Sequence, residues 1–147
     1  MDALELLKQD HQAVKDLFGQ LDDTEDTKQR KRLFDQIDTQ LNIHAHIEET
    51  VFYPEIQKIE ELKDMVEEAL EEHQEVKTLL EEIEGLDPEA EQFSASLEEL
   101  MENVEHHVAE EEDEMFPKVR ERCDQATLDR LGDQLESAKG KQHRQAI

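Results

Sequence analysis

Apolar residues recur along most of the chain at spacings of three and four residues. This is the period of an α-helix with one buried face, so each run of such residues predicts one helix. The four long predicted helices cover residues 2–21, 25–58, 62–84 and 88–122. Leu128, Leu131 and Leu135 predict a shorter helix over residues 125–138, packed on the outside, and residues 139–147 are expected to fray.

The first two long helices are repeated in the last two. An offset of 62 residues, which places His11 on His73, aligns the first and third helices, and an offset of 63 aligns the second and fourth. Two hairpins related in this way predict an all-α fold, an up-down-up-down four-helix bundle with a short extra C-terminal helix. We expect the bundle over residues 1–123, and the short helix and tail over residues 124–147. At Pro54 we expect a kink or an early helix end, because proline lacks a backbone N–H and clashes with the preceding turn.

Polar residues interrupt the apolar faces where the bundle core is expected. They are His11, His44, Glu48, His73, His107 and Glu111. Each hairpin therefore carries a lone histidine and a His-x-x-x-Glu pair, whose two residues lie one turn apart on the same helix face. Alone, such a histidine is most often a hydrogen-bonded core residue, and one His-x-x-x-Glu pair is common by chance in a chain rich in Glu. Repetition in register favours metal binding instead, because unpaired buried carboxylates and imidazoles are costly.

The donor types suggest which metals would bind and how. Imidazole nitrogen together with carboxylate oxygen suits iron or manganese, with zinc as an alternative. We expect two ions, bridged near the axis by Glu48 and Glu111, with the four histidines as terminal ligands. The sequence leaves open whether each hairpin serves one metal or the histidines are exchanged across the axis.

Other polar residues near these positions are expected to have surface or supporting roles. His46 lies about 200° around the helix from His44, which predicts a place in solvent or beside the ligands. His106 is expected to pack in the core or to contact the surroundings of the ligands. Glu49 and Glu112, which follow the two bridging glutamates, are expected at the rim of the site.

The composition narrows the class of partner. The 147 residues carry a formal net charge of −25, which disfavours nucleic acid and anionic membranes as partners and attracts cations. The chain contains one cysteine, Cys123, so no internal disulfide is expected and a reducing compartment fits. We find neither a secretory leader nor an apolar run of membrane-spanning length, so the expected location is the cytoplasm.

The order of the six polar residues resembles the hemerythrin-like (HHE cation-binding) domains. The likeness covers about residues 2–122 and rests on His11, His44-x-x-x-Glu48, His73 and His107-x-x-x-Glu111. It implies a four-helix bundle around a non-heme di-iron centre, bridged by two carboxylates and an oxo or hydroxo group, with an open position for O2. Oxygen-carrying hemerythrins have a fifth histidine one turn after the lone histidine of the third helix. Lys77 stands at that position here, so the resemblance implies a further open or water-filled position.

Three functions follow as hypotheses. The first is a di-iron protein that binds or reacts with O2, peroxide or NO, as a sensor or scavenger. The second is a di-iron peroxidase or O2-reducing enzyme at the same site. The third is a bundle that stores or buffers metal without redox chemistry. The sequence leaves open which holds, whether the protein is an enzyme, and which protein partner it has.

Overall fold

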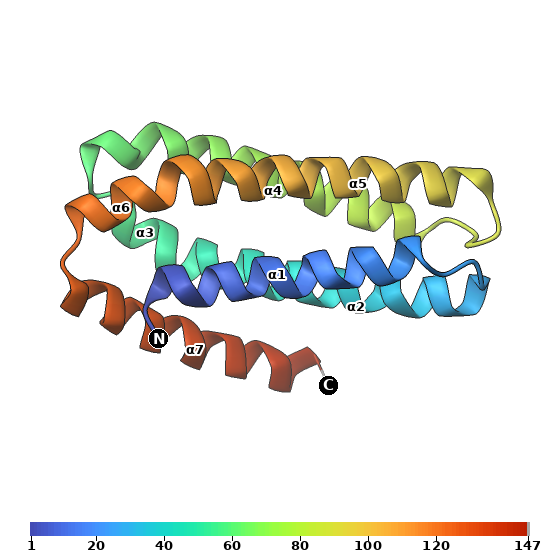
Figure 1. Ribbon diagram of the computed structural model, residues 1–147, viewed down its shortest axis with the longest axis horizontal. Helices are drawn as coiled ribbons and strands as arrows, with labels where there is room; N and C mark the ends of the chain where they lie inside the picture. The colour runs from blue at the N-terminus through green and yellow to red at the C-terminus, as the bar shows by residue number, and fades with distance from the viewer. Residues whose placement is uncertain (147) are drawn as a thin grey trace.

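Four antiparallel helical runs form the bundle in the computed structural model, which describes residues 1–146 (Figure 1). The first hairpin consists of α1 (Ala3–Asp22) and the run α2 (Thr27–Ile47), η1 (Glu48–Phe52) and α3 (Tyr53–Ile56). The second consists of η2 (Glu60–Leu62), α4 (Lys63–Glu84) and the run α5 (Glu91–Glu110), η3 (Glu111–Met115) and α6 (Phe116–Arg122). α7 (Gln125–Ala146) packs outside the bundle. The predicted all-α four-helix bundle with an extra C-terminal helix is confirmed.

The helix starts follow local hydrogen bonding. The side chain of Asp2 accepts a hydrogen bond from the backbone N–H of Glu5 at 2.9 Å and so caps the first turn of α1. The fourth long helix begins at Glu91, not at residue 88 as expected. Residues 87–90 form a separate turn instead, in which the N–H of Ala90 donates to the carbonyl of Asp87 at 2.9 Å.

The apolar core has two parts. One cluster, near α7, includes Leu7 and Ile47, and the other, toward the far end of the bundle, includes Val14 and Ile37. Along α1 the chain passes from the first cluster at Leu7 to the second at Val14, with His11 between them. The polar residues of the inward faces therefore lie in the middle of the bundle, with apolar packing on both sides.

Pro54 and Pro117 each follow a widened helical turn. In η1, a π-helical segment, the N–H of Tyr53 donates to the carbonyl of Glu48, five residues earlier. In η3 the N–H of Phe116 donates in the same way to Glu111. A π turn makes room for the proline ring against the preceding turn, so the expected kink at Pro54 takes the form of a wider helix that continues to Ile56.

The C-terminal helix is longer than expected. α7 runs from Gln125 to Ala146, so the prediction that the chain frays from residue 139 is wrong for residues 139–146, and Ile147 lies outside the described residues. Leu131 and Leu135 pack in one buried cluster with residues of α1, and the ammonium group of Lys139 forms an ion pair with Asp10. Within the described residues, no helix is both long enough and apolar enough to span a membrane.

Candidate metal centre

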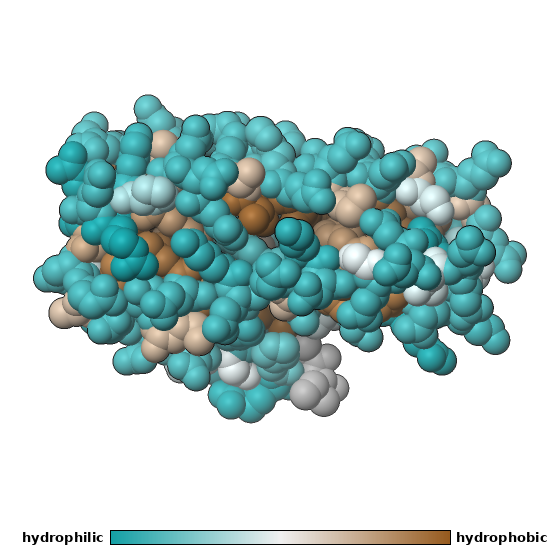
Figure 2. All heavy atoms as spheres, in the orientation of Figure 1, coloured by the Kyte–Doolittle hydropathy of each residue, from teal (hydrophilic) through white to brown (hydrophobic). Residues whose placement is uncertain are grey.

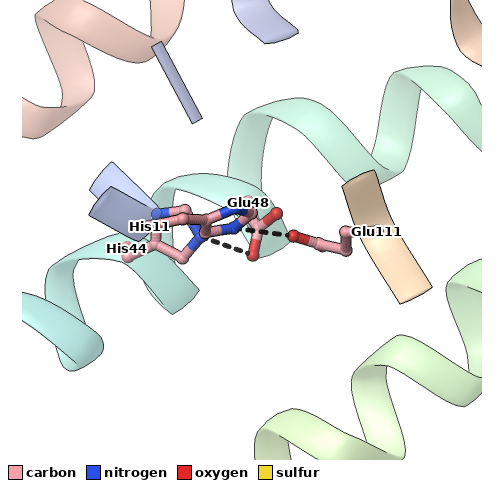
Figure 3. Close-up of side chains that lie close together, drawn as sticks. All are labelled: His11, His44, Glu48 and Glu111. Atoms are coloured by element: carbon pink, nitrogen blue, oxygen red, sulfur yellow. Dashed lines mark hydrogen bonds and ion pairs between the residues drawn. The ribbon is translucent and has the colours of Figure 1, made fainter. Parts of the chain in front are cut away.

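The polar residues of the inward faces meet in the middle of the bundle. His11 comes from α1, His44 from α2, His73 from α4 and His107 from α5, while Glu48 and Glu111 begin η1 and η3. Glu48 is 0% exposed and Glu111 is 1% exposed, so both carboxylates are removed from solvent. Figure 3 shows both glutamates beside the imidazoles of His11 and His44, with the side chains pointing toward one another.

Their donor atoms form two groups, each within 4.8 Å. One is His11, His44, Glu48 and Glu111, and the other is Glu48, His73, His107 and Glu111. In the first group, Nε2 of His44 lies 3.1 Å from Oε1 of Glu48. In the second, Nε2 of His73 lies 3.1 Å from the same oxygen. In each group, both histidines come from the same hairpin. Glu48 and Glu111 belong to both groups. Of the two pairings that the sequence left open, the donor groups match the one in which both histidines of a group come from the same hairpin.

Two of the histidines are oriented by the glutamates that follow the shared pair. Nδ1 of His11 lies 2.7 Å from Glu112, and Nδ1 of His73 lies 2.9 Å from Glu49. A carboxylate at Nδ1 fixes the ring so that Nε2 faces the centre, as in carboxylate–histidine–metal arrangements. Glu49 and Glu112 therefore lie beside the site, where they were expected, and they have a defined role in holding its histidines.

The other two histidines have carboxylate partners that the sequence reasoning missed. Nδ1 of His44 lies 3.0 Å from Asp10, and Nδ1 of His107 lies 2.8 Å from Glu72. Asp10 and Glu72 are related by the offset of 62 residues, and each directly precedes a histidine of the site. That repeated acid was the available signal, but both partners belong to neighbouring helices, and contacts between helices are set only by packing.

Tyr53 is a further polar group at the centre. Its side chain is buried, and its hydroxyl donates a short hydrogen bond to Glu111 and lies 3.3 Å from Nε2 of His73. Burial and the charges of Glu111 and Glu48 raise the pKa of the Tyr53 hydroxyl well above its ordinary value, so the group stays protonated and donates. The aligned residue of the other half is Phe116, so no repeated pattern pointed to a polar role for Tyr53.

The site has the chemistry of a cation site. Among the described residues, Oε2 of Glu48 is buried without a hydrogen-bond partner, and Nε2 of His44 is buried with only the 3.1 Å ion-pair contact to Oε1 of Glu48, which lacks hydrogen-bond geometry. Burial alone would lower the pKa of His44, but the charge of Glu48 and the hydrogen bond to Asp10 outweigh it and raise that pKa to about 10. The carboxylates therefore stabilise positive charge at this point. A metal ion would supply that charge and give Oε2 of Glu48 and Nε2 of His44 a ligand role.

The remaining candidates lie at the surface. His46 and Lys77 are exposed, so the position of the fifth histidine in oxygen-carrying hemerythrins faces outward here. The side chain of His106 is 67% exposed, and its Nε2 lies 2.9 Å from Glu110 and 3.5 Å from Glu72. His106 thus touches the carboxylate of Glu72, which orients His107. Glu72, His106 and Glu110 form a third cluster of donor atoms within 4.8 Å.

Two spaces lie beside the histidines of the site. A cavity of about 40 Å³ touches all four histidines of the site, and the rest of its wall is apolar except for Asp10. A groove of about 590 Å³ runs between α1 and the α5–η3 run, where apolar side chains show at the surface (Figure 2). His11, Val14, Val104 and Val108 line both spaces, so the groove and the cavity adjoin.

Comparison with known proteins places this arrangement in context. Residues 2–119 match the family model described as the hemerythrin HHE cation binding domain. A protein of Nostoc sp. named DNA nickase is 30% identical over 96% of this chain and 40% of its own length. An uncharacterised hemerythrin-like protein of Schizosaccharomyces pombe is 32% identical over 74% of this chain and 54% of its own. The chain thus spans about half of the length of these curated relatives, or less.

A solved structure shares the fold. It is the crystal structure of a hemerythrin HHE cation binding domain-containing protein from Mycobacterium kansasii, 25% identical to this chain. The TM-score is 0.87, and the match covers 99% of this chain and 90% of the other. The likeness therefore extends over α7 as well as the bundle.

Proposed function

The chain belongs to the hemerythrin HHE cation-binding domain family, and from that premise we propose that its buried centre holds two iron ions. His11 and His44 would hold one ion, His73 and His107 the other, and Glu48 and Glu111 would bridge them. An oxo or hydroxo bridge between the ions follows from the family resemblance. Manganese or zinc would fit the same nitrogen and oxygen donors.

The observation that carries this proposal is the pair of donor groups that share Glu48 and Glu111. A single structural ion would need only one such group. A core stabilised by hydrogen bonds alone would not leave Oε2 of Glu48 and Nε2 of His44 buried without hydrogen bonds. Two cations in contact with the two shared carboxylates account for both features.

We propose O2, peroxide or NO as the ligand of the loaded centre. A di-iron pair supplies one- and two-electron chemistry toward such small molecules. The cavity of about 40 Å³ beside the histidines fits a molecule of two or three atoms, and its mostly apolar wall suits a neutral one. The single cysteine fits a reducing compartment, so we propose the cytoplasm as the place of action.

A second candidate is an enzyme that reduces peroxide or O2 at this site. Tyr53 favours it, because reduction consumes protons and a buried hydroxyl 3.3 Å from Nε2 of His73 can hold one beside the reacting region. Metal storage fits less well, since the two buried groups offer places for only two ions. We expect no nucleic-acid binding, because a net charge of −25 repels phosphate.

The test is to count iron and record a spectrum on the same sample. Iron-loaded protein, reduced without oxygen, is expected to contain two irons per chain and to gain near-ultraviolet to visible absorption in air. His46→Ala, which alters an exposed histidine, is the matched control and should also retain two irons. Reversal of the band when oxygen is removed would favour a carrier or sensor, and irreversible oxidation with peroxide turnover would favour the enzyme. A wild-type content well below one iron per chain would overturn the proposal.

A further inference from the structure

The outer walls of the two halves differ although their inner ligands match. In the second half, Glu72, His106 and Glu110 form the surface cluster of donor atoms. The aligned residues of the first half are Asp10, Ile43 and Ile47. The first half therefore keeps the acid that orients a histidine, but it has isoleucines where the second half has His106 and Glu110.

The first half is closed by α7. Ile43 and Ile47 are 6% and 0% exposed, and Ile47 packs in the same apolar cluster as Leu131 and Leu135 of α7. Asp10 is paired with Lys139 of α7, so its charge is neutralised. A cation approaching from this side would meet an apolar wall and a lysine, and both oppose its passage.

The second half is open to solvent and acidic. The side chains of His106, Glu110 and Glu72 are 67%, 30% and 16% exposed, so exposure falls step by step from the surface inward. Glu72 links the surface to the centre, because one of its oxygens lies 2.8 Å from Nδ1 of His107 and the other lies 3.5 Å from Nε2 of His106.

A small cavity continues this line to the shared ligands. It has a volume of about 20 Å³, and its wall includes Glu68, Glu72, His107, Glu110, Glu111 and Glu114. A water molecule needs about 10–15 Å³ of such space, so the cavity has room for one water or one partly dehydrated ion. Its wall joins exposed glutamates to Glu111, which is 1% exposed.

We propose that Glu72, His106 and Glu110 form a capture site for a divalent cation, from which the ion passes through this cavity to Glu111 and His107. The inference rests on the proposed metal centre and adds how the centre is filled. Imidazole and carboxylate donors suit the same metals outside as inside, and the net charge of −25 draws cations toward the surface. The mostly apolar cavity among the four histidines, lined by α1, α2, α4 and α5, is then left for a neutral ligand.

The rate of metal uptake tests the capture site. Metal-free protein is mixed with Co²⁺, and the absorbance of the bound ion is followed in wild type, His106→Ala, Glu110→Gln and the double variant. Glu72 is left intact because it orients His107. Glu99→Gln is the matched control, because it removes the same charge from an exposed position on α5, three turns from Glu110. We expect the double variant to load about tenfold more slowly, as electrostatic steering and capture are lost, and to end with the same two buried ions.

The outcomes separate this inference from the proposed function. If wild type binds two Co²⁺ in the centre and the double variant loads as fast as Glu99→Gln, the capture site is wrong and the metal centre stands. If wild type takes up less than one ion per chain by mass spectrometry, the metal centre fails and the capture site with it. Crystals soaked in Co²⁺ should show an anomalous peak between His106 and Glu110 that is absent in His106→Ala.

Discussion

The two hairpins are alike around the centre and unlike at the surface. Each provides two histidines, a buried glutamate at the start of a π-helical segment and a proline that follows it. Outside this layer, α7 covers the first hairpin with apolar side chains, whereas the second presents acids and His106 to solvent. The residues at the buried centre are therefore of the same types in both halves, because both halves form the same centre. The residues outside it differ, because one half is covered by α7 and the other faces solvent.

At the buried centre, the two halves differ at the aligned residues Tyr53 and Phe116. The hydroxyl of Tyr53 lies 3.3 Å from Nε2 of His73, whereas Phe116 stacks against the ring of His11 with centroids 6.1 Å apart. The second donor group therefore has a buried proton donor that the first lacks. This makes the two halves chemically different although they have the same ligand types.

The largest effect is expected where the halves meet, at the shared glutamates. Glu48→Ala and Glu111→Ala should each abolish binding of both ions, because each carboxylate belongs to both donor groups. Since bound metal stabilises the folded state by about 4 kcal/mol per ion at a thousandfold excess over Kd, wild type should melt at a lower temperature after chelation, whereas neither variant should respond. Metal counting and thermal melting with and without chelator measure this, and two retained ions in either variant would contradict it.

The next largest effect, on the number of ions bound per chain, is expected from double histidine variants. They test whether each hairpin holds one metal. His11→Ala with His44→Ala removes two ligands from one donor group and should leave one ion per chain. His44→Ala with His107→Ala removes one ligand from each group and should leave none. Mass spectrometry of the loaded proteins gives the count. If the first double variant loses both ions and the second keeps one, the histidines are exchanged across the axis.

The smallest effect, on the free energy of unfolding, is expected at the N-termini of α1 and α4. Asp2 is buried, caps α1 and is approached by Arg120 and Gln125, whereas the aligned Asp64 of α4 is exposed. Asp2→Asn keeps a capping side chain but removes the carboxylate charge that faces Arg120 and the N-terminus of α1, so it should lower the free energy of unfolding at neutral pH by about 1 kcal/mol. Asp64→Asn, the control, should lower it by much less. Urea unfolding measures both.

The effect of Asp2 should depend on pH in a defined direction. Burial tends to raise its pKa, but the hydrogen bonds from Glu5, Gln125 and Arg120 outweigh burial, so the pKa lies below its ordinary value. The carboxylate therefore stabilises the protein fully above the unfolded-state pKa, and this contribution is lost as the pH falls through the folded-state pKa. Wild type and Asp2→Asn should converge in acid, and a gap that widened on acidification would contradict this assignment.

The sequence by itself determined the helices, the bundle and the six residues that meet at its centre. These follow from short-range periodicity, because residues three, four and seven apart share a helix face. Repetition at offsets of 62 and 63 then implied two equivalent hairpins, and residues at equivalent positions of a twofold arrangement must meet near its axis.

Only the tertiary structure decided which groups touch across helices. The pairings of Asp10 with His44, Glu72 with His107 and Tyr53 with Glu111 depend on helix rotation and spacing, which many side chains determine together. The same holds for α7, in which Lys139 forms an ion pair with Asp10 of α1, 129 positions earlier. A helical period specifies which face is buried, but the packing of whole faces determines which atoms meet there.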